Sequence, residues 1–104
     1  MRTLKFNVNN DTITKDSESD FSNLSKESTI QAVFSFSKDW DGYAKVAGFS
    51  RAGKELEPKI LLHGTTCDVP YEALCGTFFR MSIIGKKGNN KKQTRQILIN
   101  LNEK

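Results

Sequence analysis

The residues best suited to chemistry are basic ones close to the C-terminal end of the chain. Of the 16 lysines and arginines, five lie between positions 86 and 95, which leaves 11 basic against 12 acidic residues elsewhere. The net charge of +4 is therefore concentrated in one segment. A segment of this kind can bind phosphate groups or an acidic protein surface in a salt-dependent way. Its basic residues are Lys86, Lys87, Lys91, Lys92 and Arg95.

The same lysines also have a simpler interpretation. Gly88, Asn89 and Asn90 form a turn cluster between two apolar stretches, which predicts a hairpin tip. Exposed lysines at strand ends commonly keep a sheet soluble and protect its edges. No aromatic residue alternates with them, which argues against a platform that stacks single-stranded bases. Contact with nucleic acid is therefore expected only through this loop, and its binding role stays open.

A second candidate group is aromatic. Trp40 and Tyr43 lie beside Asp39 and Asp41, in a stretch that suits a tight turn. Exposed rings at this place, or Tyr71, could stack on a sugar or on a protein partner. Burial is the alternative, because a large aromatic ring supplies core area that a small domain needs. We favour the core for Trp40, and the exposure of the rings separates the two interpretations.

Catalytic and metal-binding constellations are not expected. His63 is the only histidine, and its neighbour Gly64 indicates a turn, whereas a general base needs an oriented partner and a nucleophile. Cys67 and Cys75 with one histidine fall short of the four ligands of structural zinc. A disulfide between them is an alternative, but free thiols are favoured because no export signal is evident. We expect a non-enzymatic chain with no cofactor.

Composition bounds the fold. With 104 residues, of which 37% are hydrophobic and 27% charged, the chain is expected to form one domain, 1–104, with a small core. No apolar run approaches the roughly 18 to 20 residues that span a bilayer, and the N-terminus lacks the apolar block of a signal peptide. We therefore expect a chain without membrane contact.

The hydrophobic period is two along most of the chain, which indicates strands. Leu4, Phe6 and Val8 alternate with polar residues, as do the apolar residues of 30–36. Pro58 restricts the strand predicted over 54–62 to an edge, a bulge or a strand start. Residues 77–84 and 94–101 are predicted to pair as an antiparallel hairpin across the basic loop.

These patterns predict an all-β fold, an antiparallel β-sandwich or small barrel of six to seven strands. One short helical turn is predicted near residues 69–74, with Asp68 as its N-cap and Pro70 as its first helical residue, crossing between the sheets. Residues 12–28 are predicted to be a loop or a weak edge strand.

The order of these features resembles a family of tail and baseplate proteins from phages of Gram-positive bacteria. The similarity covers about half the residues and nearly all of the strand order. It is carried by Phe34 and Phe36, Trp40 and Gly42, the strand from Lys45 to Phe49, the pattern Cys67, Val69, Pro70, Glu72 and Leu74, and Ile83, Ile84 and Gly85. In that family the domain often precedes a longer region, so the chain, which stops at Lys104, is expected to be a fragment or a stand-alone relative.

The resemblance implies a virion structural module of the tail or baseplate that acts by protein–protein contact, with phage tail components as partners and a homo-oligomer as the expected assembly. It also implies location in the virion and, during infection, in the host cytoplasm. A small phage-encoded inhibitor of a host defence protein, such as an anti-CRISPR protein, is the alternative, with the basic loop as its contact. A carbohydrate-binding module is the second alternative.

Overall fold

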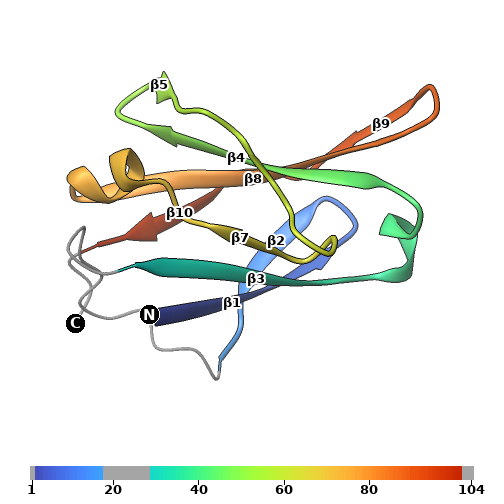
Figure 1. Ribbon diagram of the computed structural model, residues 1–104, viewed down its shortest axis with the longest axis horizontal. Helices are drawn as coiled ribbons and strands as arrows, with labels where there is room; N and C mark the ends of the chain where they lie inside the picture. Colours follow the sequence, from blue (N-terminus) through green and yellow to red (C-terminus); the bar gives the residue numbers. More distant parts are fainter. Residues whose placement is uncertain (1, 18–28, 102–104) are drawn as a thin grey trace.

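A computed structural model describes residues 2–17 and 29–101 of the chain, and within them it forms ten short strands and two 3-10 turns. The strands make two sheets that face each other across one core (Figure 1). The prediction of an all-β fold, a sandwich or small barrel, is confirmed as two sheets. The described residues contain ten strands where six to seven were predicted, because several expected strands are divided into short pieces. Residues 18–28, the greater part of the predicted loop or weak edge strand, lie outside the described residues.

The first sheet has four strands in the order β2-β1-β3-β7. These are β1 (Arg2–Asn9), β2 (Thr12–Lys15), β3 (Ile30–Phe36) and β7 (Thr66–Asp68). In β1, Leu4, Phe6 and Val8 are buried while the residues between them are exposed, as the alternation predicts. The start of the 12–28 segment thus forms an edge strand, β2.

One pairing in this sheet corrects the antiparallel prediction. β1 and β3 run parallel, with Phe6 opposite Phe34, while β2 pairs antiparallel with the other side of β1. Parallel neighbours need a connection of about a dozen residues or more, and β1 ends at Asn9 while β3 begins at Ile30, so the sequence separation permits the pairing. The sequence prediction was wrong here because the polar 12–28 segment carries no sign of which side of β1 the chain returns to.

The second sheet is built on two long strands, β4 (Ala44–Arg51) and β8 (Phe78–Lys87), which pair over seven residues. β5 (Lys54–Glu55) and β6 (Lys59–Ile60) both pair with the outer edge of β4. Pro58 lies directly before β6, so the predicted place of this proline at an edge and at a strand start is confirmed. The structure divides the strand predicted over 54–62 into β5 and β6.

The other edge of β8 also receives two strands, β9 (Asn90–Gln93) and β10 (Ile97–Asn100). Ile84 pairs with Gln93, and Met81 pairs with Ile97, so one extra residue enters the second strand between them. This is a β-bulge. The predicted antiparallel pairing across the basic loop is confirmed, and the bulge divides the returning strand in two.

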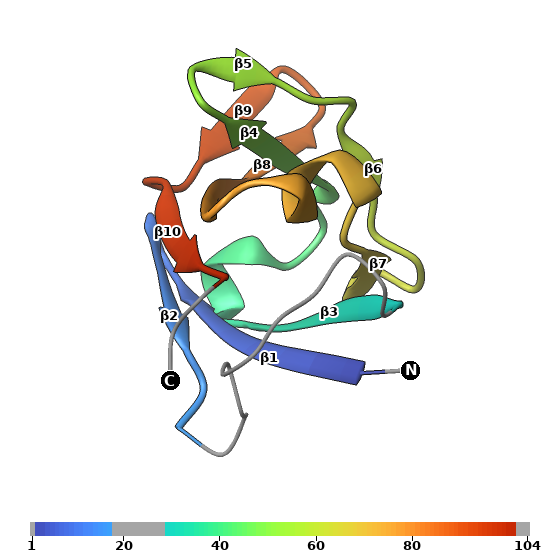
Figure 2. The same ribbon diagram turned by 90° about the vertical axis from the view of Figure 1, so that its left-hand side faces the viewer.

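Two 3-10 turns carry the chain between the sheets: η1 (Lys38–Trp40) links β3 to β4, and η2 (Tyr71–Cys75) links β7 to β8 (Figure 2). The helical turn near 69–74 is confirmed as a crossing, with one correction. It begins at Tyr71, so Pro70 takes the N-cap position and no side chain caps the turn. Proline's fixed extended geometry there, φ −64° and ψ 145°, ends β7 and starts the turn.

The core lies between the two sheets and is mostly aromatic and aliphatic. Its largest fully buried side chains are Trp40, Phe6, Phe34, Phe79, Leu4, Ile30, Met81, Ile83, Ile99 and Val8. Phe6 and Phe34, neighbours on the parallel pair, stack with ring centroids 5.4 Å apart. No helix in the described part of the chain is long and apolar enough to cross a bilayer.

Candidate functional site

The basic segment is a β-hairpin formed by the end of β8 and by β9. Lys87 pairs with Asn90 across a two-residue tip, in which Gly88 has φ +60°. This backbone region suits glycine, which has no Cβ. Successive side chains of a strand point to opposite faces, so the hairpin has an inner face toward the core and an outer face away from it. The five basic residues divide between these faces and the bulge.

The lysines on the inner face contact other parts of the folded chain. Lys92 donates from Nζ to the Asp39 carboxylate and, at 3.1 Å, to the Asp39 carbonyl oxygen. Its ammonium lies 4.9 Å from the Trp40 ring centroid and 5.8 Å from that of Tyr43. Lys87 lies 5.9 Å from the same Tyr43 ring. Both ammonium groups therefore make cation–π contacts, and that of Lys92 also forms an ion pair with a carboxylate.

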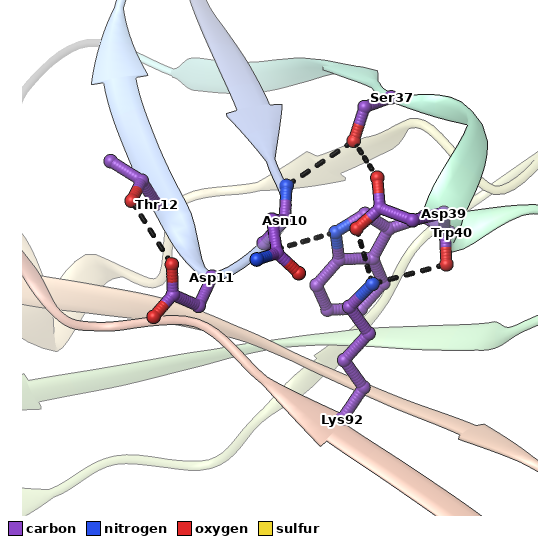
Figure 3. A network of polar contacts seen from close by, with 7 residues as sticks. All are labelled: Asn10, Asp11, Thr12, Ser37, Asp39, Trp40 and Lys92. Atoms are coloured by element: carbon purple, nitrogen blue, oxygen red, sulfur yellow. Dashed lines mark hydrogen bonds and ion pairs between the residues drawn. The ribbon is translucent and has the colours of Figure 1, made fainter.

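Lys92 belongs to a polar group that we call the anchor cluster: Asn10, Ser37, Asp39, Trp40 and Lys92 (Figure 3). The Trp40 indole Nε1 donates to the backbone carbonyl oxygen of Asn10 at 2.8 Å, and the backbone amide of Asn10 donates to the Ser37 hydroxyl oxygen at 3.2 Å. Ser37 in turn donates to Asp39. The cluster joins the β1–β2 turn, η1 and the hairpin, and so ties the two sheets together at one end.

The Asp39 carboxylate is held in its charged form by these contacts. The hydrogen bond from Lys92, followed by that from Ser37, lowers the pKa of Asp39 below its ordinary value. Both donors favour the ionised carboxylate, so the lowered pKa of Asp39 reflects its contacts within the anchor cluster. Its partners are all groups of the protein, which leaves it no evident role as a general acid.

Gly85 explains how η1 approaches the sheet so closely. A Cβ atom at this position would lie 2.7 Å from the Trp40 ring and 3.1 Å from that of Tyr43. Such a distance is far below ordinary van der Waals contact, so only glycine lets Trp40 lie flat against β8. Trp40 and Gly85, which belong to the pattern of the phage-protein resemblance, therefore meet in space for a packing reason.

Arg95 is also occupied. Its backbone amide donates to the Asp11 carbonyl oxygen at 2.7 Å, and its Nε lies 3.4 Å from the Asp11 carboxylate. The bulge turns this amide away from β8 and toward the β1–β2 turn. The ion pair is exposed and contributes little by itself, but the backbone contact adds a second link between the sheets.

Lys86 and Lys91 behave differently from the other three. They are exposed and stand directly opposite each other in the β8–β9 register, on the outer face. Within residues 2–17 and 29–101, neither side chain forms a hydrogen bond, an ion pair or an aromatic contact. Like charges directly opposite each other destabilise a strand pair. These two lysines are the ones whose charge remains available for a ligand.

The aromatic candidates separate in the same way. Trp40 is fully buried, as the core interpretation predicts, and presents no face for stacking on a sugar. Tyr43 is half-buried, with Trp40 and two lysine ammonium groups around its ring. Tyr71 is 57% exposed on η2. The three rings do not form a common stacking surface.

The remaining chemically able residues are dispersed. His63 adopts φ +55° in the turn beside Gly64, as its sequence context indicates. The described residues contain no group of three or more metal-ligating side chains. Both cysteines are free thiols: Cys67 is buried, which raises its pKa to about 12, and Cys75 is exposed.

Sequence reasoning missed the anchor cluster. The sequence pattern predicts a turn at Asp39 and groups Lys92 with four other basic residues. In the structure the two side chains form an ion pair although 53 positions separate them in the chain. The period-two pattern contained one usable signal: counting back from the tip assigns Lys86 and Lys91 to one face and Lys87 and Lys92 to the other. The spacing of the lysines does not predict which residues Lys87 and Lys92 contact.

Comparisons with known proteins give one informative likeness. No protein-family model matches the chain, and no curated protein matches it either. Among solved structures, the N-terminal domain of phage TP901-1 ORF48 is similar, with a TM-score of 0.60 at 13% sequence identity. The match covers 99% of this chain and 100% of that one. The two chains share a fold.

Proposed function

We propose that this chain is a non-enzymatic structural module of a phage virion, in the tail or baseplate, that acts by protein–protein contact. One observation carries the proposal: the fold matches the phage TP901-1 ORF48 domain over nearly the whole of both chains. A match of this extent concerns the complete arrangement of both sheets and not one common hairpin. Fold alone does not fix function, so the proposal rests also on the nature of the site.

The site supports binding over catalysis. Three of the five basic residues hold the hairpin in place, and the two remaining cations stand on a sheet face without a nucleophile or an oriented base beside them. A rigid hairpin that presents fixed charges suits recognition of a protein surface, because pre-organised contacts lose little entropy on binding.

The location of the chain in phage particles tests the proposal. Antibodies raised against the purified chain are applied to purified particles of the phage that encodes it, and bound antibody is located by immunogold electron microscopy. Label at the tail or its tip is expected. If the chain is abundant in infected-cell lysate but absent from washed particles, the virion role is wrong.

A lysate-only result would favour the inhibitor alternative. In that case, capture of the tagged chain from infected cells should recover a host defence protein, released at high salt if the exposed lysines carry the contact.

A further inference from the structure

The outer face of the second sheet carries an unpartnered apolar row next to the two free lysines. Ile60 pairs with Val46, and Val46 pairs with Ile84, so these three side chains cross β6, β4 and β8 in one line. Ile60 is 74% exposed, and the other two are half-buried. We call this line the aliphatic row.

The next row toward the hairpin tip holds the charge. Two residues further along the strands, Ala44, Lys86 and Lys91 stand side by side on the same face. One row therefore lies roughly 7 Å from the other, from the strand rise of about 3.3 Å per residue. We call Lys86 and Lys91 the lysine pair.

A shallow pocket continues the aliphatic row on its other side. It has a volume of about 150 Å³ and is lined by Gly48 and Ser82 of the sheet, by Glu55 and Pro58 beside them, and by Ile84, which it shares with the row. Because Glu55 is acidic, the pocket fits an uncharged side chain, and the carboxylate of a partner belongs at the lysines. This volume is well below the roughly 300 Å³ at which small-molecule pockets begin. It suits a protruding side chain of a partner.

We infer that the outer face of the second sheet, from this pocket to the lysine pair, is the partner-facing surface, and that its partner is an acidic protein segment that presents aliphatic side chains beside a carboxylate. The inference names the partner class of the proposed virion module and in that respect rests on the proposed function. The argument from charge is direct: a carboxylate placed between two opposed ammonium groups relieves their repulsion and gains two charge-assisted contacts.

Other occupants fit less well. A nucleic acid would leave the aliphatic row against a phosphate backbone, and no aromatic side chain lies in either row to stack a base. A second copy of the chain, docked symmetrically through the same patch, would place two lysine pairs in one interface and add no carboxylate partner for either in the rows described above, at a like-charge cost. An acidic protein segment satisfies both rows.

Selection from a library of random dodecapeptides on the immobilised full chain tests the inference without any phage component. We expect enriched peptides that combine aspartate or glutamate with leucine, isoleucine or valine. Their affinity should fall about tenfold or more in the variant with Lys86→Glu and Lys91→Glu, and also in Ile60→Asp. Far-UV circular dichroism checks that each variant is folded.

The matched control reverses two exposed lysines elsewhere, Lys38→Glu and Lys54→Glu, and so makes the same change in net charge. This control should bind the selected peptides as the parent chain does. The inference is wrong if no acidic–aliphatic peptides are enriched, or if the control loses as much affinity as the lysine-pair variant.

Binding of a single-stranded oligonucleotide that depends on the lysine pair, with no peptide enrichment, would also overturn the inference, in favour of nucleic acid. A negative peptide result with immunogold label on the tail would leave the virion role standing and reject only this surface. The two proposals therefore fail separately.

Discussion

The inner and outer faces of the β8–β9 hairpin carry two lysines each, and the two pairs do opposite things. Lys87 and Lys92 turn inward and contact aromatic rings and the Asp39 carboxylate, whereas Lys86 and Lys91 turn outward and face only each other. The residue types are identical, and the sequence spacing within each pair is the same. The difference shows that a basic segment is not one functional unit: alternation divides it into cations that stabilise the fold and cations that are free to bind.

The largest expected effect concerns Trp40, the buried ring that Lys92 contacts on the inner face. Trp40→Ala should lower the free energy of unfolding by about 3 to 5 kcal/mol, because it removes a fully buried indole and leaves a cavity. Urea unfolding followed by circular dichroism measures the loss. Tyr71→Ala, at a 57% exposed ring, is the control and should stay within about 0.5 kcal/mol of the parent chain. Equal losses would contradict the burial of Trp40.

A pair of glycine substitutions compares the two faces of the same sheet. Gly85→Ala places a Cβ 2.7 Å from the Trp40 ring and should destabilise the chain by about 1 to 3 kcal/mol. Gly48→Ala meets its nearest atom, the Ser82 hydroxyl oxygen, at an ordinary 3.5 Å and should be neutral or slightly stabilising. Thermal unfolding of both variants measures the contrast. If Gly85→Ala is the more stable of the two, η1 does not pack against β8 as described.

The electrostatic contact on the inner face is tested by pH. Because the pKa of Asp39 is lowered in the folded chain, its ionised form contributes stability above the ordinary value of 3.8, and this contribution is lost as the pH falls through the folded-state pKa. Lys92→Met removes the largest cause and should move the titration midpoint of the Asp39 carboxyl upward, as followed by carbon-detected NMR. Lys86→Met, on the outer face, should leave that midpoint unchanged. An unaltered midpoint in Lys92→Met would contradict the contact between the hairpin and η1.

The smallest effect is expected on the outer face, with the opposite sign. Lys86→Glu replaces a like-charge pair with an attractive one and should stabilise the chain by about 0.5 kcal/mol at low salt. Lys91→Glu should do the same, and the variant with both substitutions should lose the gain, since two glutamates repel as two lysines do. Chemical denaturation of all four chains at low and high salt measures the cycle. A destabilising single reversal would show that Lys86 has a partner in the free chain.

The core and most of the strands were predictable because period-two alternation records burial directly. Leu4, Phe6 and Val8 alternate with polar residues in the sequence, and the structure buries all three. Trp40 was assigned to the core from its size alone. The break at Pro58 followed from the missing backbone N–H of proline.

The parallel β1–β3 pair and the anchor cluster were not predictable, because each depends on where distant segments meet. A parallel pairing leaves no local mark when the intervening segment is polar, and the contact of Asp39 with Lys92 needs both sheets in place.

The sequence by itself therefore determined most of the strands and turns, the buried side of the strands with clear alternation, and the concentration of positive charge near the C-terminal end, since these are local properties of residue type and spacing. The tertiary structure decided which lysines are occupied and which are free. Occupancy depends on what lies opposite. Asp39 and Trp40 reach the inner face from η1 and Tyr43 from the turn that follows it, whereas no described side chain covers the lysine pair on the outer face.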